Sequence, residues 1–292
     1  MGRAVRVGFL AMLSALVALV GLVLALVRRT DERVRDIPFS DAAANIRVGA
    51  DWAARNGFAG EAVIGETEDF AVFDREDFSA AAVHPAIRRF YEHTATYEMT
   101  YTVHWHRGFR TGAWLASFAT TWLGQLNLPG RSSDRPRQLA SSLVAVPEAV
   151  DPRDSVVWTR TDSDDNAVFV AIYATHEHDG VTYANVAVPL PWSNLSTVLR
   201  PIAIAGDKAG TGVAFTTEGP GDGGLYLVTP AGPIDLPMDQ SFHVWPAGAS
   251  DAPPSPVEDA DLVATHEMWL AGRQFLTITY GIARSEIDDR AT

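Results

Sequence analysis

Residues 167–189, AVFVAIYATHEHDGVTYANVAVP, decide the predicted fold. Two runs rich in β-branched, alanine and aromatic residues flank the turn-forming sequence His178-Asp179-Gly180, which is the pattern of a β-hairpin. The first run is apolar on both faces, as expected for a strand at the centre of a sheet. This hairpin predicts an antiparallel sheet in the second half of the chain.

Strands of the same kind are predicted on both sides of this hairpin. Residues 97–106 alternate between apolar and polar side chains, and residues 274–283 place Leu276, Ile278, Tyr280 and Ile282 on one face. The stretch 246–259, rich in Pro, Ala and Asp, predicts a mobile surface loop. Further candidate strands, separated by turn-forming residues, are 141–147, 155–161, 212–217, 224–229, 240–245 and 261–270.

Helices are predicted before residue 130, over 41–57 after an N-cap at Ser40, over 84–93, and over about 111–126. Because helices and strands segregate along the chain, the predicted class is α+β. We expect an N-terminal transmembrane helix and then a mainly antiparallel β domain, a sandwich or curved half-barrel, with two or three helices in its N-terminal part. This architecture resembles that of lipocalin-like and START-like ligand carriers, which implies an apolar ligand.

The apolar run Gly8–Val27, GFLAMLSALVALVGLVLALV, contains no charge and would form a helix about 30 Å long. It predicts a single-pass helix kept as a signal anchor, with the lipid bilayer as partner. A cleaved signal peptide is the alternative, but the run is too long and VRRTDERVRD follows it instead of a small-residue cleavage site. The predicted segments are a tail (1–7), a transmembrane helix (8–27), a charged linker (28–39) and one globular domain (40–292).

The flanking charges define the side of the membrane poorly. Four arginines follow the apolar run and two precede it, which nominally keeps the domain in the cytoplasm. A β-rich module on an N-terminal anchor favours the opposite side. The predicted location is therefore a membrane, with a slight preference for an extracytoplasmic domain.

Composition excludes several classes of function. The net charge of −13 repels phosphate backbones, so no nucleic-acid partner is expected. The chain has no cysteine, which excludes disulfides, thiolate catalysis and cysteine-ligated metals. It also lacks the GxSxG, SxxK, HExxH and P-loop motifs. No cofactor is expected, and an enzyme is disfavoured.

Two histidine pairs carry the alternative hypothesis of a metal-dependent enzyme. His104 and His106 lie two apart on a predicted strand, and His176 and His178 form a second such pair before a turn. Four imidazoles that met across a sheet could bind zinc, iron or copper. The polar neighbours of the first pair favour a solvated face instead. The acidic group that includes Glu66 is likewise predicted to be solvated.

Trp114, Phe118 and Trp122 recur every four residues on the predicted helix 111–126. This aromatic stripe predicts packing on the sheet, with a lid over an apolar cavity and an interfacial membrane helix as alternatives. The three residues are the candidate ligand contacts. The sequence thus favours a membrane-anchored, non-enzymatic binding or structural domain for an apolar ligand or a membrane-associated protein partner.

Overall fold

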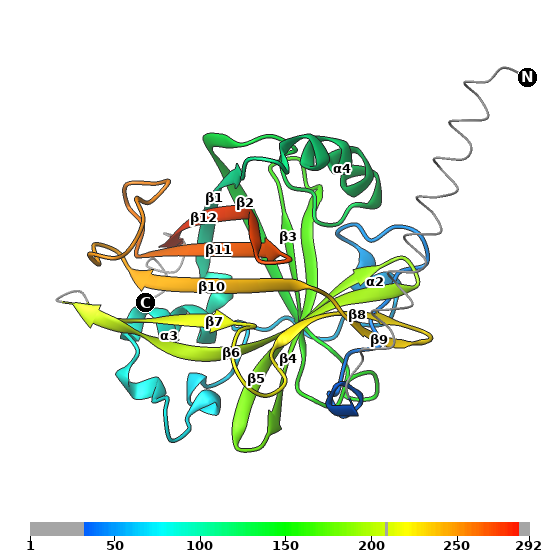
Figure 1. The fold of residues 1–292 in the computed structure, drawn as a ribbon, viewed down its shortest axis with the longest axis horizontal. Coiled ribbons are helices and arrows are strands. Elements are labelled where there is room, and N and C mark those ends of the chain that lie inside the picture. The colour runs from blue at the N-terminus through cyan, green and yellow to red at the C-terminus, as the bar shows by residue number, and fades with distance from the viewer. Residues whose placement is uncertain (1–31, 208–209, 286–292) are drawn as a thin grey trace, which may run out of the picture.

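Strand β6 (Ser193–Asp207) closes the sheet of this protein on itself. The structure is a computed structural model that describes residues 32–207 and 210–285 (Figure 1). The strand order is β5-β4-β3-β2-β1-β12-β11-β10-β7-β6, and β6 also pairs with β5. Ten antiparallel strands therefore form a closed barrel, and β8 and β9 extend β6 outside the ring.

The remaining elements are short or lie at the rim of the barrel. In Figure 1, α4 lies at the top and α3 at the lower left. The helices are α2 (Trp52–Arg55), α3 (Pro85–Glu92) and α4 (Arg110–Leu123), with 3-10 turns η1 (Glu32–Arg35), η2 (Phe70–Phe73), η3 (Ala80–Ala82) and η4 (Thr94–Thr96). The other strands are β1 (Tyr97–Trp105), β2 (Ser133–Ala145), β3 (Val156–Thr161), β4 (Ala167–His178), β5 (Val181–Leu190), β7 (Gly210–Thr216), β8 (Gly224–Thr229), β9 (Gly232–Asp235), β10 (Met238–Pro246), β11 (Leu262–Leu270) and β12 (Arg273–Arg284).

Period-two alternation defines the inner face of the barrel. The predicted alternation in 97–106 and 274–283 is confirmed, because the apolar residues predicted to share a face in the two strands are buried, apart from the partly buried Trp105 at the end of β1. The two strands pair so that Tyr101 lies opposite Tyr280 and Val103 opposite Ile278. Neighbouring strands thus bring their apolar side chains to the same side of the sheet, where they form the main core.

The predicted α+β class is wrong, and β6 is the reason. This 15-residue strand pairs with β5 through 193–199 and with β7 through 200–207, so it joins the two edges that a sandwich or half-barrel would leave open. No strand was predicted there, because the polar residues Asn194, Ser196 and Thr197 break the apolar pattern and Pro201 interrupts the run. The structure buries all three polar side chains. Closure removes the unpaired edges of the sheet.

Helices contribute less to the fold than the sequence predicts. The helices expected at 84–93 and 111–126 are present as α3 and α4, whereas 41–57 is helical only over Trp52–Arg55. Val48 instead donates a backbone hydrogen bond to Leu123, and Ala44 forms a bridge with Pro191. Tertiary pairing therefore overrides the helix propensity of this alanine-rich segment.

The described residues show neither the α+β class nor the single-pass, signal-anchor topology predicted from the sequence. Within residues 32–207 and 210–285, none of the helices combines the length and the apolar character needed to cross a bilayer. The run Gly8–Val27, predicted to be a transmembrane helix, lies outside the described residues. Part of the predicted linker is folded, since Val34 and Ile37 are buried in a small cluster with Tyr226.

Candidate functional site

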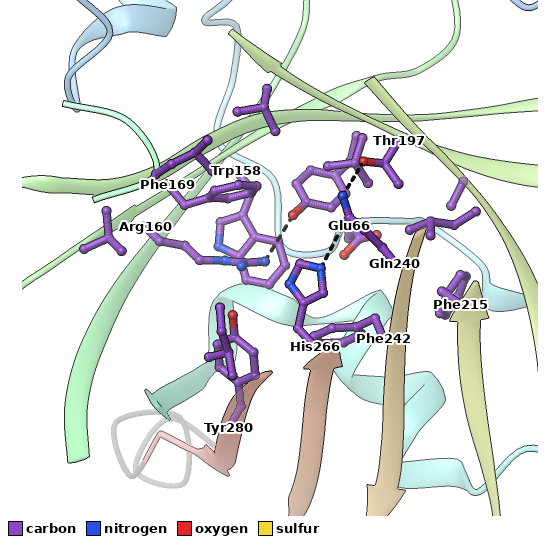
Figure 2. A pocket seen from close by; sticks show the side chains of 18 of the residues that line it. Glu66, Trp158, Arg160, Phe169, Thr197, Phe215, Gln240, Phe242, His266 and Tyr280 are labelled. Carbon is purple, nitrogen blue, oxygen red and sulfur yellow. Dashed lines mark hydrogen bonds between the residues drawn. The ribbon is translucent and has the colours of Figure 1, made fainter. Parts of the chain in front are cut away.

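A cavity of about 160 Å³ lies inside the barrel. Two segments outside the barrel strands, one before α3 and one after α4, complete its wall through Glu66 and Leu128. Most of the lining is apolar, including Phe90, Leu139, Trp158, Phe169, Phe215 and Phe242. Its charged and polar side chains point into the same space from separate elements (Figure 2); they are Glu66, Arg160, Thr197, Gln240 and His266, together with several tyrosines.

Arg160 brings a positive charge into this apolar space. It lies on β3 two residues after Trp158, so strand alternation turns both side chains inward. The guanidinium carbon is 3.6 Å from the centre of the Trp158 ring and 5.3 Å from that of Phe169, two cation–π contacts. Nη2 donates a hydrogen bond of 3.1 Å to Tyr173 Oη. These contacts hold the guanidinium in place without neutralising it.

In the part of the chain that the structure describes, no carboxylate balances this charge at contact distance. Arg160 is only 9% exposed, and among the described residues it forms no ion pair within 4.0 Å. Its Nε is buried and makes no hydrogen bond to the described chain. A buried cation without a partner is costly, and a planar guanidinium with free donors suits a carboxylate. The site is therefore electrostatically suited to an anionic group.

Glu66 is the acidic side chain that lines the same cavity as Arg160, but it lies on a segment outside the barrel strands. Residues 60–63 pair with the end of β2, and the Glu66 amide donates to the Tyr91 carbonyl at 2.8 Å. Gly65 permits this approach, because a Cβ at that position would lie 2.2 Å from the Glu92 carbonyl oxygen. Burial raises the pKa of Glu66 to about 7, although the positive charge of Arg160 opposes the shift.

A hydrogen-bonded chain of three side chains also lines the cavity. His266 Nε2 lies 2.7 Å from Gln240 Oε1, and Gln240 Nε2 donates to Thr197 Oγ1 at 3.2 Å (Figure 2). This arrangement assigns the proton to His266 Nε2, because the amide oxygen can only accept. Burial, together with a smaller effect of the positive charge of Arg160, lowers the pKa of His266 to about 4. The imidazole is therefore neutral at physiological pH.

Hydroxyl and indole groups add neutral donors. Burial raises the pKa of Tyr91, Tyr173 and Tyr280 above the ordinary value, so these phenols keep their protons. Tyr91 Oη and Trp158 Nε1 are buried and make no hydrogen bond to the described chain. Unpartnered donors of this kind are rare in folded proteins and indicate a missing partner such as water or a ligand.

The structure brings together each predicted histidine pair but not the two pairs. His104 lies on β1 and His106 follows the end of that strand, with ring centres 4.9 Å apart, and β2 and β3 separate β1 from β4, which carries the second pair. His176 and His178 both contact Asp222, at 2.9 and 2.8 Å. In the described part of the chain, no group of three or more histidine, aspartate or glutamate side chains is arranged to hold a metal ion.

The aromatic stripe of α4 does not pack on the sheet, so that prediction is wrong. Trp114, Phe118 and Trp122 are exposed on the surface, and none of them lines the cavity. In α4 only Ala113 is buried. The candidate ligand contacts predicted from the sequence are thus placed outside the barrel.

The cavity residues were not found by sequence reasoning. Glu66 was predicted to be solvated, and Arg160 and His266 were not singled out. A signal existed for Arg160 and His266, because each lies in phase with buried residues of its strand: Arg160 follows Trp158, and His266 follows Ala264. A charged or titratable side chain on an otherwise apolar strand face indicates a buried polar site.

The chain is similar to the uncharacterized membrane protein YndJ of Bacillus subtilis (strain 168), with 31% identity over 221 residues. The matched region is 75% of this chain but only 38% of the Bacillus protein, so this chain spans well under half of its relative's length. No family model matches the chain, and no solved structure matches it.

Proposed function

We propose that this protein is a membrane-associated, non-enzymatic binding protein whose barrel holds a compact apolar molecule with a carboxylate group. The observation that carries the proposal is Arg160, a buried cation in an apolar cavity, to which no carboxylate of the described chain comes within contact distance. An anionic ligand supplies the missing counter-charge. The free donors of Arg160, Tyr91 and Trp158 supply its hydrogen bonds.

The size of the cavity limits the ligand. A cavity of about 150 Å³ lined by apolar side chains accepts a molecule as large as benzene, and this one is about 160 Å³. A short-chain fatty acid or a small aromatic acid fits this space with its carboxylate at Arg160. The aromatic walls around Trp158 contact the apolar part.

Membrane association rests on separate grounds. The sequence-related Bacillus protein is described as a membrane protein. The run of apolar residues 8–27 has the length and composition to contact a lipid bilayer. The ligand-binding barrel is accordingly held at a membrane surface.

Calorimetric titration of the purified full chain with hexanoate tests the ligand. We expect saturable binding of hexanoate and much weaker binding of 1-hexanol, which has the same chain length without the charge. Arg160→Gln should lower the affinity for hexanoate at least tenfold, about 1.4 kcal/mol. Arg89→Gln, at an exposed position of α3, is the matched control and should bind like the wild type.

Glu66 provides a second test, in which the substitution strengthens the binding of hexanoate instead of weakening it. Above pH 7 its carboxylate competes with an acidic ligand for Arg160, so hexanoate should bind more weakly at pH 8 than at pH 6. Glu66→Gln should restore binding at pH 8. Equal affinities of hexanoate and hexanol, or unchanged binding by Arg160→Gln with a normal melting temperature, would refute the carboxylate assignment.

A further inference from the structure

We propose that α4 docks this protein on the surface of an anionic lipid bilayer. Its exposed aromatic stripe enters the interface, and the arginines around it bind the acidic head groups. This surface is made of other residues than the apolar run 8–27, and it orients the barrel on the membrane.

The exposed face of α4 has the composition of an interfacial helix. Trp114, Leu115, Phe118 and Trp122 are between 42% and 63% exposed, although large apolar side chains normally avoid water. Tryptophan prefers the boundary between head groups and acyl chains. A 14-residue helix with one buried residue lies on the surface and offers this face to a membrane.

The charge around α4 complements an anionic membrane. Between residues 99 and 147 the chain carries five arginines and a single acidic residue, Asp134, although the whole protein has a net charge of −13. Such a local reversal of charge is what an electrostatic membrane contact requires. The five are Arg107, Arg110, Arg131, Arg135 and Arg137, all exposed.

Local packing places Arg107, Arg110 and Arg131 beside the stripe. Arg107 and Arg110 lie at the turn into α4, where Arg110 Nε donates to the Trp105 carbonyl. After α4 the chain returns against the helix at Gly130, where a Cβ would lie 3.1 Å from the Trp114 Cα. Arg131 therefore emerges next to Trp114. Apolar and positive groups share one surface, which distinguishes it from an apolar protein–protein patch.

The docking surface also adjoins the cavity. A second pocket of about 210 Å³ lies against α4 at Ser117 and Thr121, and it shares Tyr101 and Leu128 with the wall of the barrel cavity. Docking through α4 places this end of the barrel against the lipid, where an apolar acid is concentrated. This consequence rests on the proposed function, whereas the docking itself does not.

The absence of cysteine allows a direct test on the full chain. Phe118→Cys is labelled with an environment-sensitive fluorophore, and the protein is reconstituted in bilayers with or without 30% phosphatidylglycerol. The matched control is Val72→Cys, 41% exposed in η2 beside α3, on another side of the barrel from α4 (Figure 1). We expect lipid-borne quenchers to reduce the emission at position 118 at least threefold more than at position 72 in the anionic bilayers.

Charge variants complete the experiment. Arg107→Gln combined with Arg131→Gln should remove most of the quenching at position 118, and Arg89→Gln on α3 should not. Equal, weak quenching at positions 118 and 72 would overturn the proposal. So would quenching that is the same in zwitterionic and anionic bilayers. Repeating the measurement with Arg160→Gln separates docking from ligand binding, because quenching should persist when hexanoate binding is lost.

Discussion

The strongest energetic prediction concerns Glu66, whose carboxyl the fold holds inside the barrel. Its pKa rises from 4.5 to about 7, chiefly because burial disfavours the charged form. Each pKa unit corresponds to about 1.36 kcal/mol, so ionised Glu66 destabilises the folded protein by about 3 kcal/mol. Glu66→Gln should recover this free energy wherever the wild-type residue is ionised.

The sign of the pH dependence follows from proton binding. Below pH 4.5 the carboxyl is protonated in both states and costs nothing. Between pH 4.5 and about 7 only the folded state keeps the proton, so its stability falls as the pH rises. Above pH 7 the full cost is present. Urea unfolding of the full chain, measured by tryptophan fluorescence, should therefore show the stability advantage of Glu66→Gln growing by about 3 kcal/mol from pH 4 to pH 9.

Glu68→Gln is the matched control, two residues farther along the same segment and exposed. Its stability relative to the wild type should stay constant across the pH range. If the advantage of Glu66→Gln is equally constant, Glu66 titrates like a solvated acid, and its placement inside the barrel cavity is refuted.

Three further predictions test the barrel. The wild type should lose about 3 kcal/mol of folding stability as the pH falls from 6.5 to 4, because the lowered pKa of His266 keeps the folded imidazole neutral while the unfolded one gains a proton. His266→Asn should abolish this loss, and unfolding curves with unchanged acid sensitivity would contradict the prediction. Gly65→Ala should destabilise by several kcal/mol, since its Cβ meets a backbone carbonyl, and a melting temperature within 2 °C of the wild type (about 1 kcal/mol or less) would argue against this placement. Ile278→Asp should cost about 4 kcal/mol or more and Thr100→Asp, on the outer face, under about 1; equal urea midpoints would show that the faces are misassigned.

Local pattern determined the strands and the longer helices. Alternation in 97–106 and 274–283 specified which side chains of β1 and β12 face the interior, because successive residues of a strand point to opposite sides. The turn at Asp179-Gly180 and helices α3 and α4 were predicted for the same reason: their signals lie within a few neighbouring residues. The charge and cysteine content of the chain likewise needed no structure.

Closure of the barrel was decided by tertiary structure alone. Strand β6 has buried polar residues and a proline, so it carries no strand pattern, yet its backbone satisfies the edges of β5, β7 and β8. The cavity depends on that closure. Arg160 and His266 are far apart in sequence, and only the closed sheet turns both of them into one cavity, where Glu66 reaches them from a segment outside the strands. The exposure of Trp122 has the same origin: the apolar face of the sheet, which α4 was expected to cover, packs against itself inside the closed barrel. Sequence thus determined the elements and their faces, whereas long-range strand pairing determined which faces enclose a site and which are left to contact other molecules.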